Sequence, residues 1–179
     1  MIYMFLANGF EEVEALCPLD LLRRAGLDVK TVGIGSKLIT GAHNITVEAD
    51  ITDTELEEPR PDMIILPGGM PGTTNLGSSH VVDAAICSAL KDNTYIAAIC
   101  AAPMILGKRG ILNGKRAICY PGFEQYLDGA TLAEEKVVVD GRIITAAGMG
   151  VALDFGLTLV SLLAGEETAA KIRSAIIAK

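Results

Sequence analysis

The sequence predicts a single α/β domain with a doubly wound, mostly parallel sheet and helices on both faces. The first observation is that short strand-like apolar runs alternate with helical patterns along the whole chain. The second is that glycine, proline, cysteine and acidic residues cluster directly after several of these runs. Strands joined by crossover helices form parallel sheets, and a chain of 179 residues suits one domain over residues 1–179.

The first half of the chain is expected to alternate strands with helices. The first helix ends at Arg24, and its acidic start, 11–16, is interpreted as a short turn kinked against a helix that begins at Pro18. The proline-rich segment 57–61 is expected to be a loop. Strands are predicted at 2–7, 29–32, 63–66 and 95–99, a small hairpin at 38–40 and 45–47, and a second helix at 81–90.

The second half continues the alternation and ends in two helices. Proline at position 103 suits the first turn of a helix that follows Cys100. The dipeptide Asp140-Gly141 is a strong hairpin signal, and Gly165 separates the last two helices. Strands are predicted at 116–119, 137–139 and 143–146, and helices at 151–163 and 166–177.

Composition limits the classes of function. The net charge of −7, with lysines and arginines scattered along the chain, argues against a nucleic-acid footprint. No apolar stretch approaches the roughly 20 residues of a membrane span, and the N-terminal run lacks a basic leader, so we expect a cytoplasmic protein. Because 50% of the residues are hydrophobic and only 21% charged, we also expect a homo-oligomer whose other partner is a small molecule.

The unusual residues fall at the carboxyl ends of the predicted strands. These ends share one edge of an open parallel sheet, and ligands bind in the crevice at that edge. Five loops are therefore expected to converge there: 9–14, 67–72, the turn at Cys100, 120–122 and 148–150.

Cys100 lies where a buried strand meets the start of a helix. The pattern small-x-Cys-x-small from Ala98 to Ala102 is the cysteine counterpart of the elbow that holds a nucleophilic serine in strained backbone. A helix N-terminus favours the thiolate, so we expect Cys100 to be acidic and reactive. The alternative is a buried structural cysteine, which is the commoner role of a free cysteine.

Glu14 is the candidate proton carrier for this thiol. A carboxyl beside a thiolate retains its proton through like-charge repulsion and desolvation, and it then acts as a general acid or base. Glu11, Glu12 and Glu14 have an alternative role, which is to complement a helix N-terminus.

An oxyanion hole is expected beside Cys100. Glycine at positions 68 and 69 lets backbone N–H groups approach a ligand oxygen, and the N–H of Ala101 can join them. Taken alone, the Pro67-Gly-Gly segment is equally consistent with a plain tight turn.

The other cysteines and the two histidines are assigned no catalytic role. Cys17, Cys87 and Cys119 are expected to pack in the core, with Cys119 left open as a resolving thiol for Cys100. No C-x-x-C pair is present, and His43 and His80 lack a second soft ligand at metal-binding spacing, so neither a disulfide nor a metal site is expected. Both histidines are expected at the surface.

The combination of these motifs resembles the ThiJ/PfpI superfamily, specifically its DJ-one branch, along essentially the full chain. The motifs that carry the resemblance are Gly9-x-Glu-Glu-x-Glu14, Leu66-Pro-Gly-Gly69, Ala97-Ala-Ile-Cys-Ala101 and Gly148-x-Gly150. The resemblance implies a flavodoxin-like fold, a homodimer, and a reactive cysteine bonded to a protonated glutamate, which match Cys100 and Glu14. It also matches the oxyanion-hole glycine to Gly69. At the dimer interface it suggests Arg24, for which a solvated cation at a helix C-terminus is the alternative.

One residue departs from the family pattern. Many relatives carry a histidine shortly after the strand that follows the elbow, and Tyr120 takes that place here. Without a cysteine–histidine dyad, peptidase or amidase activity is not expected. Tyr120 is instead expected to shape the pocket and to donate a hydrogen bond to the substrate. The alternative is that it only packs against Pro121 and Phe123.

The resemblance implies a cofactor-independent glyoxalase or deglycase that acts on 2-oxoaldehydes or their glycation adducts through an oxidation-sensitive cysteine. The alternative is a redox sensor or chaperone of oxidative stress in which turnover is incidental. Both hypotheses use Cys100, so only rates separate them.

Overall fold

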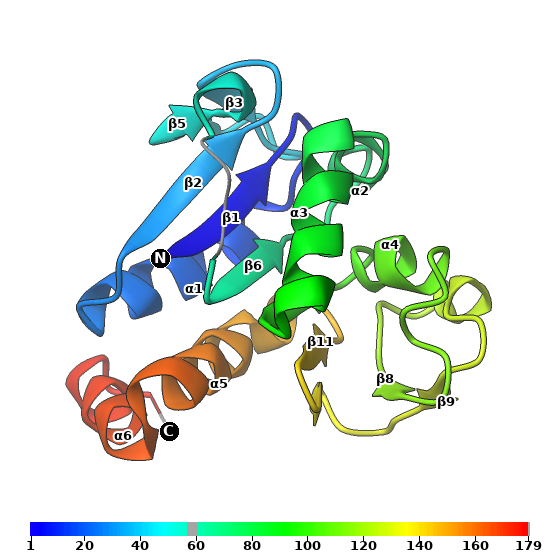
Figure 1. Ribbon diagram of the computed structural model, residues 1–179. Coiled ribbons are helices and arrows are strands. Elements are labelled where there is room, and N and C mark those ends of the chain that lie inside the picture. The colour runs from blue at the N-terminus through cyan, green and yellow to red at the C-terminus, as the bar shows by residue number, and fades with distance from the viewer. Residues whose placement is uncertain (57–60, 179) are drawn as a thin grey trace.

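The fold is an α/β sandwich around a mostly parallel sheet, as predicted. The computed structural model describes residues 1–56 and 61–178. Within these residues, seven strands form the central sheet in the order β10-β11-β7-β6-β1-β2-β5 (Figure 1). Each neighbouring pair is parallel except the β10–β11 hairpin. The strands are β1 (Ile2–Leu6), β2 (Val29–Gly33), β5 (Ile51–Thr52), β6 (Met63–Leu66), β7 (Tyr95–Ile99), β10 (Val137–Asp140) and β11 (Ile143–Ala146).

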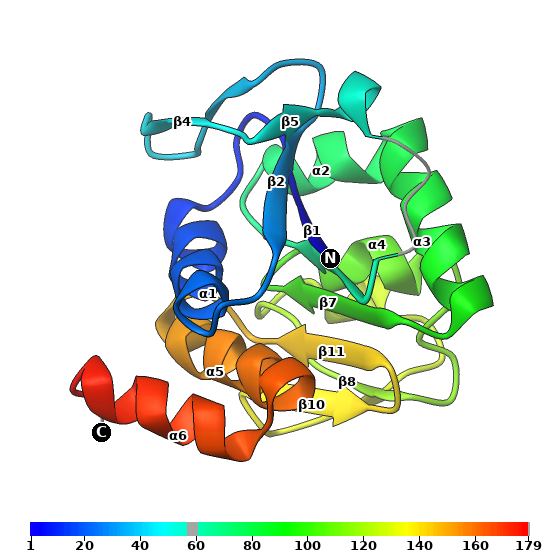
Figure 2. The same cartoon turned by 60° about the vertical axis from the view of Figure 1, so that its left-hand side comes forward.

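Helices cover both faces of this sheet. One face carries α1 (Glu12–Arg24) and α5 (Ala152–Ala164), with α6 (Glu166–Ala175) packed against α5. The opposite face carries α2 (Gly72–Gly77), α3 (His80–Asp92) and α4 (Pro103–Gly107), and Figure 2 shows the sheet between the two layers. Short 3₁₀ turns lie at η1 (Asp53–Glu55), η2 (Glu124–Tyr126) and η3 (Met149–Val151).

Alternation along the strands divides the core into two layers. In β1, Met4 and Leu6 face the cluster that includes α1 and α5, whereas Phe5 faces the cluster that includes α2, α3 and α4. Successive strand residues point to opposite faces, so a strand covered on both sides is apolar throughout. Fully burying each such side chain contributes about 1.5–3 kcal/mol. The continuous apolar runs that predicted β6 and β7 therefore mark the centre of the sheet.

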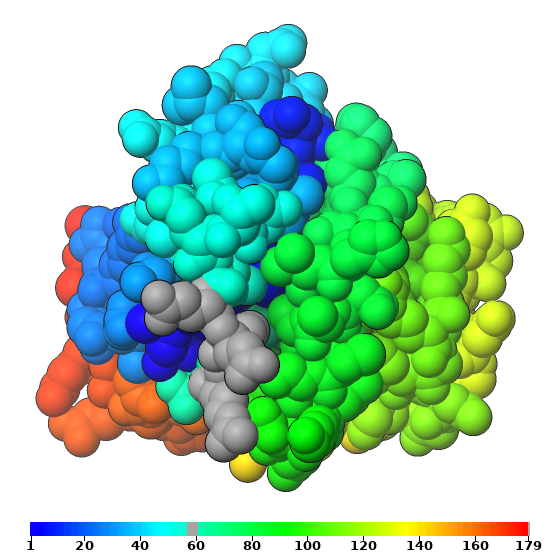
Figure 3. Space-filling view, turned by 45° about the horizontal axis from the view of Figure 1, so that its top comes forward, coloured from blue at the N-terminus to red at the C-terminus, as the bar shows by residue number. Residues whose placement is uncertain are grey.

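The β3–β4 hairpin lies outside this sheet. Strands β3 (Leu38–Thr40) and β4 (Thr46–Glu48) pair antiparallel, which confirms the small hairpin expected from the sequence. The segment that contains it forms one end of the molecule, and α6 lies toward the other (Figures 1 and 3). Backbone hydrogen bonds from Gly9 N–H to the Thr40 carbonyl and from Ala42 N–H to the Phe10 carbonyl, each 2.8 Å long, hold the hairpin against the loop after β1.

Two predictions about elements need correction, the first of them in part. The strand predicted at 116–119 is only β8 (Arg116–Ala117), which pairs with β9 (Thr131–Leu132) in a separate ladder. This strand does not pair with the main sheet, because the Ile118 N–H donates to the Thr145 hydroxyl at 3.0 Å. The chain then turns toward Cys100. Of the loop expected at 57–61, residues 57–60 lie outside the described residues.

The second correction concerns α1, which runs without a break through Pro18 from its N-cap at Glu11. Proline removes one helical hydrogen bond. The helix continues because Ala15, Leu19 and Leu22 bury one stripe in the core. Pro18 itself packs closely on Gly156 of α5, where an added Cβ would lie 2.9 Å from the Pro18 Cα.

The topology has its switch point between β1 and β6. From β1 the chain proceeds through α1 to β2 on one side, whereas from β6 it proceeds through α3 to β7 on the other. Ligands bind at such a switch point, outside the carboxyl ends of the strands. Among the described residues, no helix combines the length and apolar character needed to cross a membrane.

Candidate active site

Four segments distant in sequence meet at this edge of the sheet. Glu14 comes from the first turn of α1, Gly68 follows β6, Cys100 follows β7 and Gly148 follows β11. An added Cβ on Gly68 would lie 2.5 Å from Glu14 Oε2 and 2.6 Å from the Cys100 Cβ, so only glycine fits between these two side chains. The convergence expected from the sequence is thus present for these residues.

Cys100 occupies a strained elbow, as expected. Its φ of 64° lies in the left-handed region, which costs a residue with a side chain about 1–3 kcal/mol. Two backbone hydrogen bonds hold it there, from Cys100 N–H to the Ala146 carbonyl (2.9 Å) and from Tyr120 N–H to the Cys100 carbonyl (2.8 Å). The residue is half-buried.

Glu14 is fully buried beside this thiol, with an exposed fraction of 0%. Its Oε2 accepts a hydrogen bond of 3.0 Å from the Gly68 N–H. Its Oε1 makes no hydrogen bond of ordinary geometry in the part of the chain that the structure describes, although the Cys100 thiol and the Met149 backbone lie near enough to lower the pKa of the carboxyl. Nearly all buried polar atoms are paired, so an unpaired carboxyl oxygen next to a cysteine marks a position for a proton or a ligand.

The two side chains shift each other's protonation. Burial raises the pKa of Glu14 to about 7, and the negative charge of Glu11 adds to this shift, although contact with the Cys100 thiol lowers the pKa. Burial and the charge of Glu14 raise the pKa of the Cys100 thiol to about 12. The expectation that a helix N-terminus would make this thiol acidic is therefore wrong while Glu14 is charged, because desolvation and repulsion outweigh the nearby N–H groups.

Backbone N–H groups surround the sulfur. Those of Gly69 and Ala101 face the Cys100 thiol and lower its pKa. Gly69 has a φ of 87°, and any side chain on it would clash with the backbone of Phe10 and Glu11. The pair of donors has the character of an oxyanion hole, which requires preorganised N–H groups beside the nucleophile.

Tyr120 borders the same space. An added Cβ on Gly148 would lie 3.2 Å from the Tyr120 ring and 3.8 Å from Glu14 Oε1. Tyr120 and Met149 are 50% and 53% exposed, so they line the mouth of the site, whereas Glu14 lies at its base. The ring reaches the site although β8 is not part of the main sheet, because the Tyr120 N–H is tied to the Cys100 backbone.

The other cysteines lie apart from this arrangement. Cys119 packs in the cluster beneath α3 and α4, on the opposite face of the sheet from the cluster that Cys100 contacts. Burial raises the pKa of the Cys119 thiol to about 11, and these positions argue against a resolving role. Cys17 is half-buried against the core as expected, but Cys87 is exposed rather than packed.

His43 has a partner that the sequence did not predict. Its Nδ1 lies 2.8 Å from Glu12 Oε2 and its backbone N–H donates to Glu12 Oε1 at 2.7 Å. Burial opposes ionisation of Glu12, but these hydrogen bonds lower its pKa, and Glu12 in turn raises the pKa of His43. Sequence spacing gives no signal for the pair, because the β3–β4 hairpin brings the two residues together across 31 positions.

Ligand atoms of Glu11, Glu12 and His43 lie within 4.8 Å of one another, a geometry in which a metal ion fits. Both oxygens of Glu12 already accept hydrogen bonds from His43, and Glu11 accepts one from the Glu14 N–H. The cluster therefore anchors the hairpin to α1. His80, which begins α3, does not join it.

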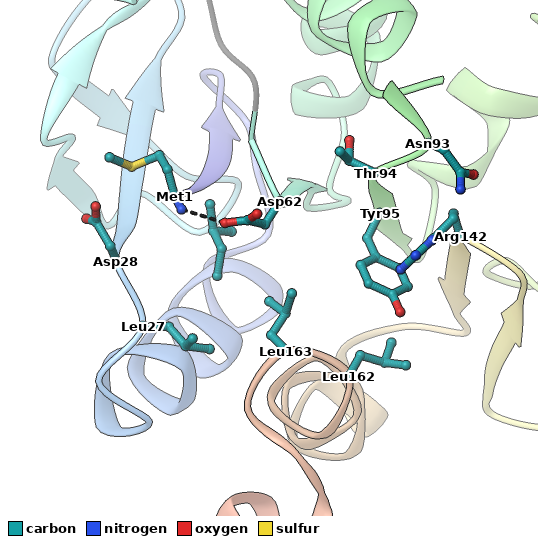
Figure 4. A pocket seen from close by; sticks show the side chains of 11 residues that line it. Met1, Leu27, Asp28, Asp62, Asn93, Thr94, Tyr95, Arg142, Leu162 and Leu163 are labelled. Carbon is teal, nitrogen blue, oxygen red and sulfur yellow. Dashed lines mark hydrogen bonds and ion pairs between the residues drawn. The ribbon is translucent and has the colours of Figure 1, made fainter. Parts of the chain in front are cut away.

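A separate cavity of about 440 Å³ lies at the opposite edge of the sheet, beside the amino ends of β1 and β7 (Figure 4). Three of its charged groups have partners, since the Met1 ammonium pairs with Asp62 at 2.7 Å and the Arg142 guanidinium lies 4.3 Å from the Tyr95 ring centroid. Because neither cysteine nor histidine is among the residues that line this cavity, we place the functional site at Cys100.

Comparisons with known proteins point to one family. The model of the DJ-1/PfpI family matches residues 1–162. The glutathione-independent glyoxalase DJR-1.2 of Caenorhabditis elegans is 31% identical over 159 residues, which cover 88% of this chain and 84% of the worm protein. The oxidized form of Toxoplasma gondii DJ-1 superposes with a TM-score of 0.95 at 31% identity, over 99% of this chain and 97% of that one.

A plant relative is longer. DJ-1 homolog B of Arabidopsis thaliana is 35% identical over 175 residues, which cover 96% of this chain. The same match spans only 40% of the length of the plant protein.

Proposed function

Because the chain belongs to the DJ-1/PfpI family, we propose that it is a cofactor-independent, cysteine-dependent glyoxalase or deglycase that converts small 2-oxoaldehydes, or their glycation adducts, to 2-hydroxy acids. The observation that carries the proposal is the buried, unpaired Oε1 of Glu14 beside the strained Cys100. The glyoxalase from C. elegans is similar over most of this chain, which supports the same reaction class.

The chemistry depends on where the pair keeps its proton. Since the pKa of Glu14 is raised to about 7, the pair loses its first proton near neutral pH. The remaining proton lies either on the sulfur of Cys100 or on the carboxyl of Glu14. Two groups coupled in this way titrate as a unit. When Glu14 holds the proton, its charge no longer opposes the thiolate and its O–H can donate to sulfur. This second form is the nucleophile.

In the first half of the reaction, the Cys100 thiolate attacks the aldehyde carbon and the carbonyl π bond breaks. Glu14 gives its proton to the new alkoxide, which leaves a hemithioacetal and a charged carboxylate. In a glycation adduct, the former aldehyde carbon carries an amine or a thiol. The Cys100 sulfur bonds to this carbon, and the bond to the amine or thiol breaks, so that this group leaves with a proton. The N–H groups of Gly69 and Ala101 are placed to stabilise negative charge on this oxygen.

In the second half, Glu14 removes the hydrogen from the former aldehyde carbon and gives an enediolate. The hydroxyl proton on that carbon moves to the neighbouring oxygen, and Glu14 returns its own proton to the neighbouring carbon. The product is a 2-hydroxy thioester on Cys100. Water then hydrolyses the thioester, releases the 2-hydroxy acid and restores the thiol, so the net reaction consumes one water.

The test is steady-state turnover of methylglyoxal by purified protein. Wild type should form lactate, whereas Cys100→Ala should show only the background rate. Cys87→Ala is the matched control, because Cys87 is exposed and far from the site in the α3 layer. Lactate formation by Cys100→Ala at the wild-type rate, or none by wild type, would contradict the proposal.

A second candidate function is a redox sensor or chaperone of oxidative stress. The half-buried Cys100 in strained backbone favours it, and the similar Toxoplasma gondii protein is known in an oxidized form. In this case peroxide should convert Cys100 to the sulfinic acid before Cys17, as peptide mass spectrometry would show. Oxidation accompanied by a change in oligomer or client binding, without turnover above the rate of a free thiol, would favour the sensor.

A further inference from the structure

Glu11 belongs to a closed circuit of hydrogen bonds beneath the site. Its carboxylate Oε2 accepts from the Glu14 N–H at 2.7 Å. Its own N–H donates to the Gly68 carbonyl at 2.9 Å, and the Gly68 N–H donates to Glu14 Oε2 at 3.0 Å. Three bonds thus join the backbone of Glu14, the glycine loop and the carboxyl of Glu14 in one ring.

We propose that Glu11 is a positioning residue for the Cys100–Glu14 pair, which fixes the carboxyl against the glycine loop and uses its negative charge to direct the shared proton onto Glu14. The inference deepens the proposed function and rests on the sharing of a proton between these two side chains. Glu11 is half-exposed at the N-cap of α1 and hydrogen-bonds the backbone of Glu14 and of Gly68, so it acts through Glu14.

Helix capping alone does not account for this arrangement. A cap contributes about 0.5–2 kcal/mol to helix stability and needs only the hydrogen bond to the N-terminal turn. Here the capping residue also bonds the loop that carries the candidate oxyanion glycine, and a side chain on Gly69 would clash with the Glu11 backbone. Glu11, the loop at Gly68 and Gly69, and the carboxyl of Glu14 therefore fix one another's positions.

The negative charge of Glu11 influences whether the proton shared by Cys100 and Glu14 lies on the sulfur or on the carboxyl. The titratable groups that face Glu14 are Cys100 after β7, Glu11 on its own helix, and Tyr120 across Gly148. Glu12 lies nearby on α1, but its charge is paired with His43. Glu11 raises the pKa of Glu14, since a second negative charge one helical turn away opposes ionisation. With one proton on the pair, this repulsion favours the acid–thiolate form.

The test measures the rate at which iodoacetamide alkylates Cys100 as a function of pH, followed by peptide mass spectrometry. Glu11→Gln retains an oxygen that accepts from the Glu14 N–H but removes the charge. We expect its alkylation midpoint to fall by about one pH unit, and its rate at pH 7.5 to fall by about threefold to tenfold, because the negative charge moves from sulfur to Glu14.

Controls separate charge from folding. Glu11→Asp keeps both the charge and a good capping group, so it should alkylate within twofold of wild type. Asp20→Asn makes the same change of charge at an exposed site farther along α1 and should leave the profile unchanged. If Glu11→Gln matched wild type in midpoint and rate, or if Asp20→Asn shifted both equally, the role of Glu11 would be refuted.

The experiment also distinguishes this inference from the proposed function. Alkylation requires no turnover, so it reports on the pair even if methylglyoxal is not a substrate. A Glu14→Gln protein with the wild-type profile would refute proton sharing itself. A changed Glu14→Gln profile together with an unchanged Glu11→Gln profile would refute only the role of Glu11.

Discussion

Glu14 makes the stability of the fold depend on pH. Its pKa is raised from 4.5 to about 7 by burial, so the folded state binds more protons than the unfolded state between these values. The free energy of unfolding therefore falls as pH rises from 4.5 to 7, by about 3 kcal/mol from this group, and is flat above that range.

Glu14→Gln removes this dependence, because glutamine stays neutral. Urea unfolding at pH 5 and pH 8 should show a smaller loss of stability for Glu14→Gln than for wild type, by about 3 kcal/mol. Glu48→Gln, at an exposed position on β4, is the control and should retain the wild-type slope. An equal change in the free energy of unfolding between pH 5 and pH 8 for all three proteins would contradict this prediction. It would show that folding does not raise the pKa of Glu14.

Tyr120 is expected to assist the reaction without acting as its base. A phenol hydroxyl donates a hydrogen bond to a substrate far more readily than it takes up a proton. Tyr120→Phe should therefore lower turnover of methylglyoxal roughly tenfold or less, the scale of one hydrogen bond, whereas Glu14→Gln should remove most of it. A dead Tyr120→Phe beside an active Glu14→Gln would reverse these roles.

At the scale of elements, the loop between β6 and α2 sets the spacing of the site. Gly68→Ala would force a methyl group to within 2.6 Å of the Cys100 Cβ and 2.9 Å of the Ile99 carbonyl. A displacement of Cys100 or of the Ile99 backbone by about 1 Å is enough to lower turnover about 100-fold, and we predict a loss of this size for Gly68→Ala.

Gly150→Ala, in η3 after β11, is the matched control for Gly68→Ala, because an added Cβ at position 150 meets open space. Thermal unfolding of both variants should show that Gly68→Ala remains folded when its activity is measured. Wild-type turnover by a folded Gly68→Ala protein would mean that Glu14 and Cys100 need not be this close.

Elements with a strong local signal were predictable from the sequence. The strands at 63–66, 95–99 and 143–146 have the predicted bounds, because continuous apolar runs are typical of strands buried on both faces. The elbow at Cys100 was predictable for a related reason, since small residues beside it leave room for the turn. Its φ of 64° confirms the strained backbone.

Features that depend on tertiary contacts were not predictable. Proline at position 18 indicated a helix start, but packing on Gly156 keeps α1 continuous. The short α2 and the two-residue β5 lack a periodic pattern long enough to detect. The raised pKa of Cys100 comes first from burial and then from Glu14, and neither is visible in a chain where the two residues lie 86 positions apart.

At the scale of the whole molecule, we predict a homodimer. Apolar side chains are exposed near the site on α1 and on the β3–β4 hairpin, with exposed fractions of 43% for Val13, 37% for Leu16 and 53% for Ile45. Exposed apolar patches of this kind mark association surfaces. Arg24, at the far end of α1, is bonded to Asp20 at 2.5 Å.

Light scattering at micromolar concentration should give twice the monomer mass of 18.8 kDa. Val13→Asp should weaken the association, because it places a charge within the apolar surface, whereas Leu132→Asp on the distant β9 should leave it intact. A wild-type mass near that of the monomer would refute the dimer.

The origin of the hydrogen on the product tests the central claim most directly, which is that Glu14 carries a proton between the two reacting carbons. Methylglyoxal is converted in D₂O, and the lactate is examined by proton NMR. If Glu14 exchanges its proton with solvent, lactate should carry deuterium at C2, and Glu14→Gln should form none above background. Lactate formed by Glu14→Gln at the wild-type rate, with the wild-type deuterium content at C2, would contradict the mechanism.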